Sequence, residues 1–300
     1  MNDIDQLHNS DYAGLKEILK KLGRVAIAYS GGVDSTLVLR VAADVLKDSV
    51  MAITARSDTT PQEEHEDAVR FTRQIGVRHI VVETHEMRIP EFVQNPPNRC
   101  YICKKYRYEA LMAIADQHGF TVIADGENAD DGKDYRPGRL AARELGVRSP
   151  LCEAGLTKDR VRDLSKMLGL STWNKPALAC LASRVPYFSA LTPEKLRQID
   201  EAETFIRSRG SITQVRVRHF GDTARIEMDS NGITRMMTPS IREQVISFLK
   251  QLGFVHILLD MEGYRMGNLN HIRQQLTFHT NQTEIIKNSS GTKQNSDQQK

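Results

Sequence analysis

The sequence predicts an α/β protein in which a parallel-sheet domain is followed by a smaller α+β domain. Short β-branched runs alternate with longer helical stretches over the first part of the chain, and this alternation is typical of a parallel sheet. This alternation changes after Thr192-Pro193. The final residues are polar, with almost no apolar periodicity. We therefore expect domains at residues 1–191 and 192–276, and a disordered tail at 277–300.

The elements of the first domain follow from apolar periodicity and from glycine and threonine signals. After a helix at 11–22, we expect strands at 24–29, 50–54, 79–83 and 121–124, with helices at 35–46, 61–75 and 104–117. Gly76 and Gly119 stand where helix C-caps belong. Thr157 is a candidate N-cap for a helix that stops at Gly169.

The second domain is expected to be a compact α+β unit. A loop at 171–191, rich in small residues and prolines, connects it to the first domain. We expect a hairpin that turns at Gly221-Asp222. The full set of elements is a helix at 194–208, strands at 213–219 and 223–229, a helix at 239–252 and a strand at 255–260.

The composition argues against several classes of function. The formal net charge is +3 with acids and bases almost balanced, so we expect no nucleic-acid partner. The acidic start of the chain lacks a signal-peptide pattern, and no apolar run approaches the ~20 residues of a membrane span. We expect a cytoplasmic protein with no membrane partner, whose four cysteines stay reduced and serve as nucleophiles or metal ligands.

The strongest local signal is a glycine turn between an apolar run and an apolar helix, Val25-Ala26-Ile27-Ala28-Tyr29-Ser30-Gly31-Gly32-Val33-Asp34-Ser35-Thr36. Glycines let the backbone approach an anion, and the amides and dipole at the start of a helix favour phosphate. Ser30 and Ser35 add hydroxyl donors, and Asp34 can hold a magnesium ion that bridges phosphates. The turn therefore predicts a phosphate site.

This turn has no lysine, so it is not a Walker P-loop. Ser-Gly-Gly-Val-Asp-Ser instead resembles the PP-loop of ATP pyrophosphatases, which have an adenine nucleotide alpha hydrolase-like fold. The resemblance implies that Ser30, Gly31, Gly32, Val33, Asp34 and Ser35 grip the β,γ-pyrophosphate of ATP. It also implies transfer of AMP to an oxygen of the substrate. Asp125 follows a predicted parallel strand, which is where open α/β sheets place ligand-binding groups.

A second group of candidate functional residues consists of cysteines. A stiff proline turn, Asn95-Pro96-Pro97-Asn98, delivers the pair Cys100 and Cys103 to the head of a helix. Two thiolates at this spacing can face one metal centre. Further along, Cys180 lies close in sequence to Lys175 and Arg184, and a basic neighbourhood would lower the pKa of its thiol.

Together with the PP-loop, several segments resemble the LarE family of ATP-dependent sulfur transferases, which help to build the nickel-pincer nucleotide cofactor of lactate racemase. The segments are 125–138, 149–151, 175–184, 217–222 and 260–265, and the resemblance extends to about Asn270. It implies a small nucleotide substrate, pyridinium-3,5-biscarboxylic acid mononucleotide, with ATP and Mg²⁺ as cofactors and self-assembly into a homo-oligomer.

The resemblance implies a mechanism centred on Cys180. A substrate carboxylate is adenylated with release of pyrophosphate, and a thiolate then displaces AMP. In one version Cys180 forms a thioester and loses its sulfur, which leaves dehydroalanine. In the other, Cys100, Cys103 and Cys180 hold a [4Fe-4S] cluster that carries an extra sulfide, and the protein survives turnover. A structural zinc site that includes Cys152, or buried inert thiols, are the alternatives.

Charged residues in the second domain are further candidates. Arg216 and Arg218 alternate along a strand, so both project from one face and could clamp a substrate phosphate. Glu227 on the returning strand matches a family carboxylate that helps to bind a divalent ion, which would be Mg²⁺. The alternative for all three residues is a solvated charged face of the sheet.

Two other functions remain open. A tRNA-modifying PP-loop enzyme, of the thiolation or lysidine type, would use the same adenylation on a base, but the chain lacks an RNA-binding module with interleaved basic and aromatic residues. A non-catalytic nucleotide-binding sensor would not need the intact Ser30–Ser35 loop.

Overall fold

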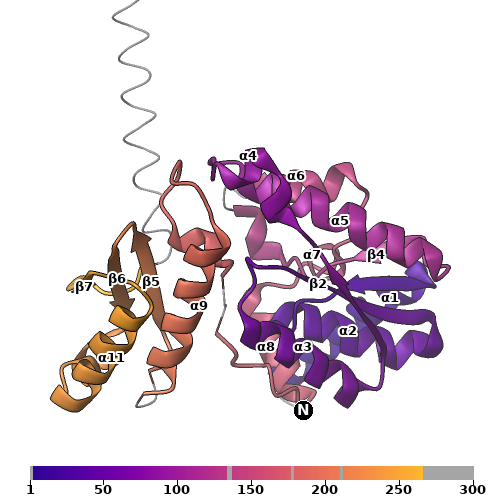
Figure 1. Ribbon diagram of the computed structural model, residues 1–300. Coiled ribbons are helices and arrows are strands. Elements are labelled where there is room, and N and C mark those ends of the chain that lie inside the picture. Colours follow the sequence, from indigo (N-terminus) through magenta and orange to yellow (C-terminus); the bar gives the residue numbers. More distant parts are fainter. Residues whose placement is uncertain (1–2, 134–136, 177–178, 210–211, 266–300) are drawn as a thin grey trace, which may run out of the picture. The chain divides into compact units, whose positions relative to one another are not determined.

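The computed structural model describes residues 3–133, 137–176, 179–209 and 212–265. The chain divides into two compact units, of which the first contains the residues up to Ala182 together with Phe188–Thr204. The second contains Ser183–Tyr187 and the residues from Phe205 onward (Figure 1). Each unit has a sheet of its own.

The first unit is built on a parallel sheet of four strands in the order β3-β2-β1-β4. The strands are β1 (Val25–Ala28), β2 (Val50–Arg56), β3 (Arg78–Glu83) and β4 (Val122–Ala124). Val25 pairs with Val50 on one side and with Val122 on the other, so β1 is central. The strand order reverses between β1 and β4, and in open α/β sheets ligands bind at the carboxyl ends of strands at such a point.

Helices cover both faces of this sheet (Figure 1). Residues of β1 alternate between the two faces: Val25 and Ile27 pack against one set of helices, and Ala26 packs against the other. The first set includes α1 (Asp3–Leu22), α2 (Val33–Leu46), α3 (Gln62–Ile75) and α8 (Lys158–Met167). The second set includes α5 (Arg99–Gln117) and α6 (Pro137–Glu144).

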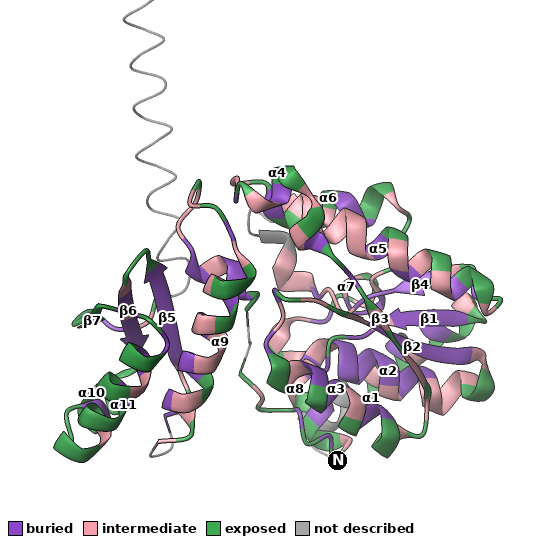
Figure 2. Ribbon diagram, in the orientation of Figure 1, coloured by how far each residue is buried: buried purple, intermediate pink, exposed green. Residues whose placement is uncertain are grey.

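Strands β1 and β2 are largely buried, whereas the residues of the edge strand β3 are half-buried or exposed (Figure 2). Val25, Ala26 and Ile27 are fully buried because β1 is covered on both faces. The amphipathic helices bury one stripe and expose the other, as shown by α3, where Ala68 and Phe71 face the core. This packing fixes the carboxyl end of β1, where the glycine turn begins.

Several local predictions are confirmed. Gly76 caps α3 in the left-handed conformation, and Gly119 follows α5 with φ of 73°. The side chain of Thr157 accepts a hydrogen bond from the amide of Arg160, so it is the N-cap of α8. The expected strands and longer helices are present with shifted ends. The largest shift is at α1, which begins at Asp3 rather than at residue 11, and α5 begins at Arg99 rather than at residue 104.

Short helices were missed because they carry too few residues for a periodic pattern. They are α4 (Pro90–Val93), α6, α7 (Pro150–Glu153) and α10 (Ser230–Met236), with the 3₁₀ turns η1 (Lys47–Ser49), η2 (Glu86–Arg88), η3 (Ala129–Lys133) and η4 (Leu181–Arg184). Each of α4, α6 and α7 opens with a proline, which is favoured in the first turn of a helix.

The second unit contains a mixed three-stranded sheet in the order β5-β6-β7. The hairpin of β5 (Val215–Phe220) and β6 (Thr223–Met228) turns at Gly221, which has φ of 69°, as predicted. The strand β7 (His256–Leu259) runs parallel to β6. The helices α9 (Pro193–Arg207), which begins in the first unit, and α11 (Pro239–Gln251) complete the set, and the predicted α/β fold class is confirmed.

Parts of the predictions lie outside the described residues. These are the tail at 277–300, residues 134–136 of the segment 125–138, and residues 177–178 ahead of Cys180. Among the helices that the structure describes, each one is too short or too polar to cross a membrane.

Candidate functional site

The predicted phosphate loop lies at the carboxyl end of the central strand. After β1 ends at Ala28, four residues lead to α2, whose N-cap is Gly32 and carries no side-chain capping bond. The amides of the first turn of α2 are therefore not capped by that residue and can serve an anion. Val33, Asp34 and Ser35 form this first turn, so the structure brings the predicted loop residues together.

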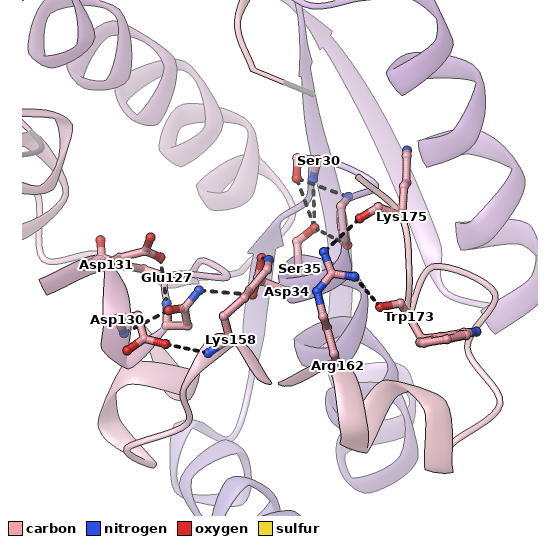
Figure 3. A network of polar contacts seen from close by, with 12 residues as sticks. Ser30, Asp34, Ser35, Glu127, Asp130, Asp131, Lys158, Arg162, Trp173 and Lys175 are labelled. Carbon is pink, nitrogen blue, oxygen red and sulfur yellow. Dashed lines mark hydrogen bonds and ion pairs between the residues drawn. The ribbon is translucent and has the colours of Figure 1, made fainter. Parts of the chain in front are cut away.

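Two serine hydroxyls brace the loop (Figure 3). The Oγ atoms of Ser30 and Ser35 are 3.1 Å apart, and the Ser30 amide lies 3.3 Å from the Ser35 Oγ. Gly31 has φ of 72°, and a Cβ there would lie 3.1 Å from the backbone nitrogen of Ala68. Gly31 is therefore required both by the turn and by the close approach of α3.

Asp34 is held by two partners from distant parts of the chain (Figure 3). Its Oδ1 accepts a hydrogen bond of 3.2 Å from Asn128 Nδ2, and its Oδ2 forms an ion pair with Lys158. A single carboxylate beside a phosphate site suits Mg²⁺, which is usually bound by one or two carboxylates together with the phosphates. Asp34 therefore fits the predicted magnesium role.

Lysines bring positive charge to the loop. Lys175 donates to the carbonyl of Gly31 at 3.2 Å and pairs with Asp67 at 2.6 Å, while Lys158 lies at Asp34. Lys158 could not be predicted from the sequence, because it lies 124 positions from Asp34 and carries no local motif. The loop thus combines helix amides, hydroxyls, one carboxylate and two ammonium groups, a set that can bind a polyphosphate with its metal ion.

Asp125 lies at the end of β4, beside the loop. It accepts hydrogen bonds from Tyr108 Oη at 2.6 Å and Ser149 Oγ at 2.8 Å, and Lys104 Nζ is 3.6 Å away. Burial raises the pKa of Tyr108 well above its ordinary value, and Asp125 raises it further. The carboxylate is therefore a fixed acceptor within a buried network.

Gly126 is a further residue of the site that sequence reasoning missed. A Cβ at this position would lie 2.6 Å from the backbone nitrogen and 2.9 Å from the Cα of Ser35. Real Cβ atoms essentially never approach so closely, so only glycine lets β4 pack directly against the loop. The sequence feature that could have predicted this contact is the glycine at position 126, because a glycine at a strand often marks a close approach of two backbones.

The residues after Gly126 form a turn that reaches Asp34. Burial and the nearby Asp125 raise the pKa of Glu127, which pairs with Arg139. The Asn128 side chain accepts from the Asp130 amide at 3.0 Å, and Asp130 in turn accepts from the Lys158 amide at 2.9 Å. The turn therefore orients Asn128 and Lys158 toward Asp34 (Figure 3).

The predicted cysteines gather within the first unit. Cys100 is exposed and Cys103 half-buried on α5, and Cys180 is exposed. Burial raises the pKa of Cys103 to about 12, and the charges of Cys180 and Cys100 add to this shift. Cys100 and Cys180 therefore each lie within electrostatic range of Cys103.

Metal ligation is a stricter condition than proximity. Among the residues that the structure describes, no three His, Cys, Asp or Glu side chains are arranged to hold a metal ion. The fourth cysteine, Cys152, lies half-buried on α7, where its amide donates to the carbonyl of Glu127 at 3.1 Å.

Arg107 provides positive charge near the thiols, which sequence reasoning had expected from Lys175 and Arg184. The pKa of Arg107 is raised even though burial opposes its charge, because Cys103, Glu86 and Cys180 attract it. Lys175 is instead engaged with the phosphate loop. The sequence feature that could have identified Arg107 is its position four residues after Cys103, which places both residues on the same face of the helix.

A pocket of about 300 Å³ opens at the carboxyl ends of β2 and β3 in the same unit. Its lining includes Leu181, the residue after Cys180, together with polar side chains such as Arg56, Ser57, His65 and Arg197. Its volume is at the lower end of the range for small-molecule sites.

In the second unit, Arg216 and Arg218 are both buried on β5. Arg218 Nη2 lies 2.6 Å from Glu227 Oε2, and Arg225 Nη2 lies 2.9 Å from Glu227 Oε1. The guanidinium carbon of Arg216 lies 5.1 Å from the centre of the Tyr264 ring. These charges belong to a buried network rather than to a solvated face of the sheet.

Comparisons with known proteins agree with this geometry. Residues 9–172 match the NAD synthase family. An uncharacterized protein of Synechocystis is 43% identical over 88% of this chain and 98% of its own length. Pyridinium-3,5-bisthiocarboxylic acid mononucleotide synthase of Lactiplantibacillus plantarum is 39% identical over 86% of this chain and 93% of its own length.

A tRNA-specific 2-thiouridylase of Desulforamulus reducens is more distant, at 28% identity over 51% of this chain and 53% of its own length. An ATP-using enzyme is therefore supported by the phosphate loop and by relatives that match along nearly the whole chain. The chain belongs to the PP-loop ATP pyrophosphatases and, within them, to the LarE family of sulfur transferases.

Proposed function

We propose that this protein adenylates a carboxylate of pyridinium-3,5-biscarboxylic acid mononucleotide and converts it to a thiocarboxylate with sulfur delivered through Cys180. The observation that carries the proposal is the cluster of Cys180 with Cys103 and Arg107 in the unit that also holds the phosphate loop. The relative from Lactiplantibacillus plantarum, whose name gives the bisthiocarboxylic product, supports the choice of substrate.

The phosphate loop would perform the first step. Amides of the first turn of α2, the serine hydroxyls and Lys175 would bind the β,γ-pyrophosphate of ATP. Asp34 would hold Mg²⁺, which neutralises charge on the phosphates when bound. A carboxylate oxygen of the substrate attacks the α-phosphorus, the bond to the leaving pyrophosphate breaks, and an acyl-adenylate forms.

The second step uses the thiolate of Cys180, the kind of protein nucleophile that is strongest near neutral pH. The sulfur attacks the acyl carbon, a carbon–sulfur bond forms, and the bond to AMP breaks with AMP as leaving group. A base then removes the Cα proton of the residue, and the Cβ–S bond breaks. The products are a thiocarboxylate and dehydroalanine at position 180.

The cluster version is a second candidate, supported by the proximity of Cys103 to both Cys100 and Cys180. In it, a [4Fe-4S] cluster would supply the sulfur and the protein would be reused. Cys180 takes part in both routes, and the mass of the protein after turnover distinguishes them.

The second unit would recognise the phosphate of the substrate. Arg216 and Arg218 lie on one side of β5, and paired guanidinium groups suit a phosphate. Glu227 holds Arg218 and Arg225 in place and would contribute to a divalent-ion site. Replacement of Arg216 with Ala should raise KM for the mononucleotide while leaving KM for ATP unchanged.

The test is a reaction with ATP, Mg²⁺ and the mononucleotide, followed by pyrophosphate release, product mass and intact protein mass. A protein mass lower by roughly 34 Da, the mass of H₂S, is expected for sulfur taken from a cysteine. Unchanged protein mass, with bound iron and sulfide in anaerobic protein, would favour the cluster route. Pyrophosphate release that depends on a tRNA instead would favour the tRNA-modifying alternative, and no release at all would favour a sensor.

Localisation in the cytoplasm and assembly into a homo-oligomer stay predictions. Light scattering of purified protein checks the second of these. A monomer at micromolar concentration would contradict it.

A further inference from the structure

Arg107 connects the two cysteine-bearing segments of the first unit. It lies on α5 one turn after Cys103, and its side chain is only 24% exposed. Its Nε pairs with the carboxylate of Glu86, which is fully buried. The Cys103 Sγ lies 4.0 Å from Oε1 of the same carboxylate.

The other end of the guanidinium organises a turn after β2. Arg107 Nη2 lies 2.6 Å from Ser57 Oγ, 2.7 Å from Thr59 Oγ1 and 3.3 Å from Thr60 Oγ1. The turn is closed internally, because the Ser57 and Thr59 hydroxyl oxygens are 3.0 Å apart. Thr59 is fully buried, so the geometry of this turn depends on its hydrogen bonds.

The same turn holds the backbone beside Cys180. The amide of Leu181 donates to the carbonyl of Thr59 at 2.8 Å. A short chain of contacts therefore leads from Cys103 through Arg107 and Thr59 to the residue that follows Cys180. A charged donor that satisfies several acceptors at once is strong enough to fix such a turn.

We propose that Arg107 is a positioning residue for sulfur transfer, since it fixes the turn at residues 57–60 to which the Cys180 loop is anchored. This inference rests on the proposed function. Without Arg107, Glu86 and three hydroxyls lose their shared donor, and the Leu181 anchor loosens. A nucleophile displaced by about 1 Å can lose about 100-fold in rate, although the phosphate loop is untouched.

The experiment compares Arg107→Met with Arg107→Lys, Thr59→Val and wild type. Arg40→Met is the control, because Arg40 also pairs with an acid, Asp44, but is 40% exposed on α2, which packs on the opposite face of the sheet from α5. We measure pyrophosphate release, thiocarboxylate formation, melting temperature, and hydrogen exchange at the Leu181 amide. Exchange reports directly on the bond to Thr59.

For Arg107→Met we expect pyrophosphate release within about threefold of wild type and thiocarboxylate formation lowered by about 10- to 100-fold. Exchange at Leu181 should be at least about tenfold faster, with partial recovery in Arg107→Lys and a smaller change in Thr59→Val. Arg40→Met should match wild type in all four readouts.

Thiocarboxylate formation and Leu181 exchange at wild-type rates in Arg107→Met would overturn the inference. A parallel loss of pyrophosphate release and melting temperature, without faster exchange at Leu181, would also overturn it, because Arg107 would then serve general stability. If wild type itself forms no thiocarboxylate, the proposed function fails. Exchange at Leu181 would still decide whether Arg107 holds the loop.

Discussion

Replacement of Gly126 with Ala should disable the phosphate loop through a steric effect alone. The new Cβ would lie 2.6 Å from the Ser35 nitrogen, and ordinary contacts begin at 3.4 Å, so the two backbones must separate by about 0.8 Å. Ser35 lies in the first turn of α2, and its displacement would carry the anion-binding amides with it. We expect a loss of about 1–3 kcal/mol in the free energy of unfolding, typical of overpacking.

The effect on activity should be larger than the effect on stability. A misplacement of this size should lower the rate of pyrophosphate release by about 10- to 100-fold. The assay is substrate-dependent pyrophosphate release, combined with urea denaturation. The matched control is Gly14→Ala on α1, where an added Cβ meets no atom within 4 Å and should stabilise the helix. Wild-type release and stability in Gly126→Ala would refute the close approach on which the reasoning depends.

Three further predictions concern charges. Asp34→Ala should remove the magnesium contact and abolish pyrophosphate release; unchanged release with substrate would contradict that role. Arg218→Met should lower the free energy of unfolding by about 1–3 kcal/mol in urea denaturation, because the buried Glu227 carboxylate loses one charged partner and keeps Arg225. An unchanged free energy of unfolding would contradict this role of Arg218. Burial lowers the pKa of His79, so the unfolded chain binds a proton first as the pH falls. Stability should decline below about pH 6.5, and His79→Asn should flatten that decline in urea titrations; an unchanged slope would show that His79 does not cause it.

The local sequence was sufficient for the fold and for the phosphate loop. Strand, glycine turn and helix are adjacent along the chain, so their order alone predicts Ser30, Asp34 and Ser35 at one end of the sheet. Gly76 and Thr157 could be placed because caps depend on a few neighbouring residues.

The partners of that loop could not be predicted in the same way. Lys158 and Asn128 reach Asp34 only after α8 and the turn beyond β4 have packed against α2. Arg107 likewise acquires its role from the turn at residues 57–60, and no local pattern connects the two. Contacts between residues so far apart follow from tertiary packing, which periodicity does not encode.

Local sequence was also a poor guide to the charged residues around Cys180. Proximity in sequence favoured Lys175 as the source of positive charge, but this lysine turns to the Gly31 carbonyl and to Asp67. Five residues of separation leave the backbone enough freedom to direct the two side chains to different sites. Arg107 on α5, which lies within electrostatic range of Cys180, carries no comparable signal in the neighbouring sequence.

The most direct test of the central claim is the reaction of Cys180→Ser with ATP, Mg²⁺ and the mononucleotide, with pyrophosphate and thiocarboxylate measured in the same mixture. Cys152→Ser serves as the control for the loss of a half-buried thiol. If sulfur is delivered through Cys180, Cys180→Ser should release pyrophosphate and form no thiocarboxylate, while Cys152→Ser should form both products. Thiocarboxylate made by Cys180→Ser would contradict the account.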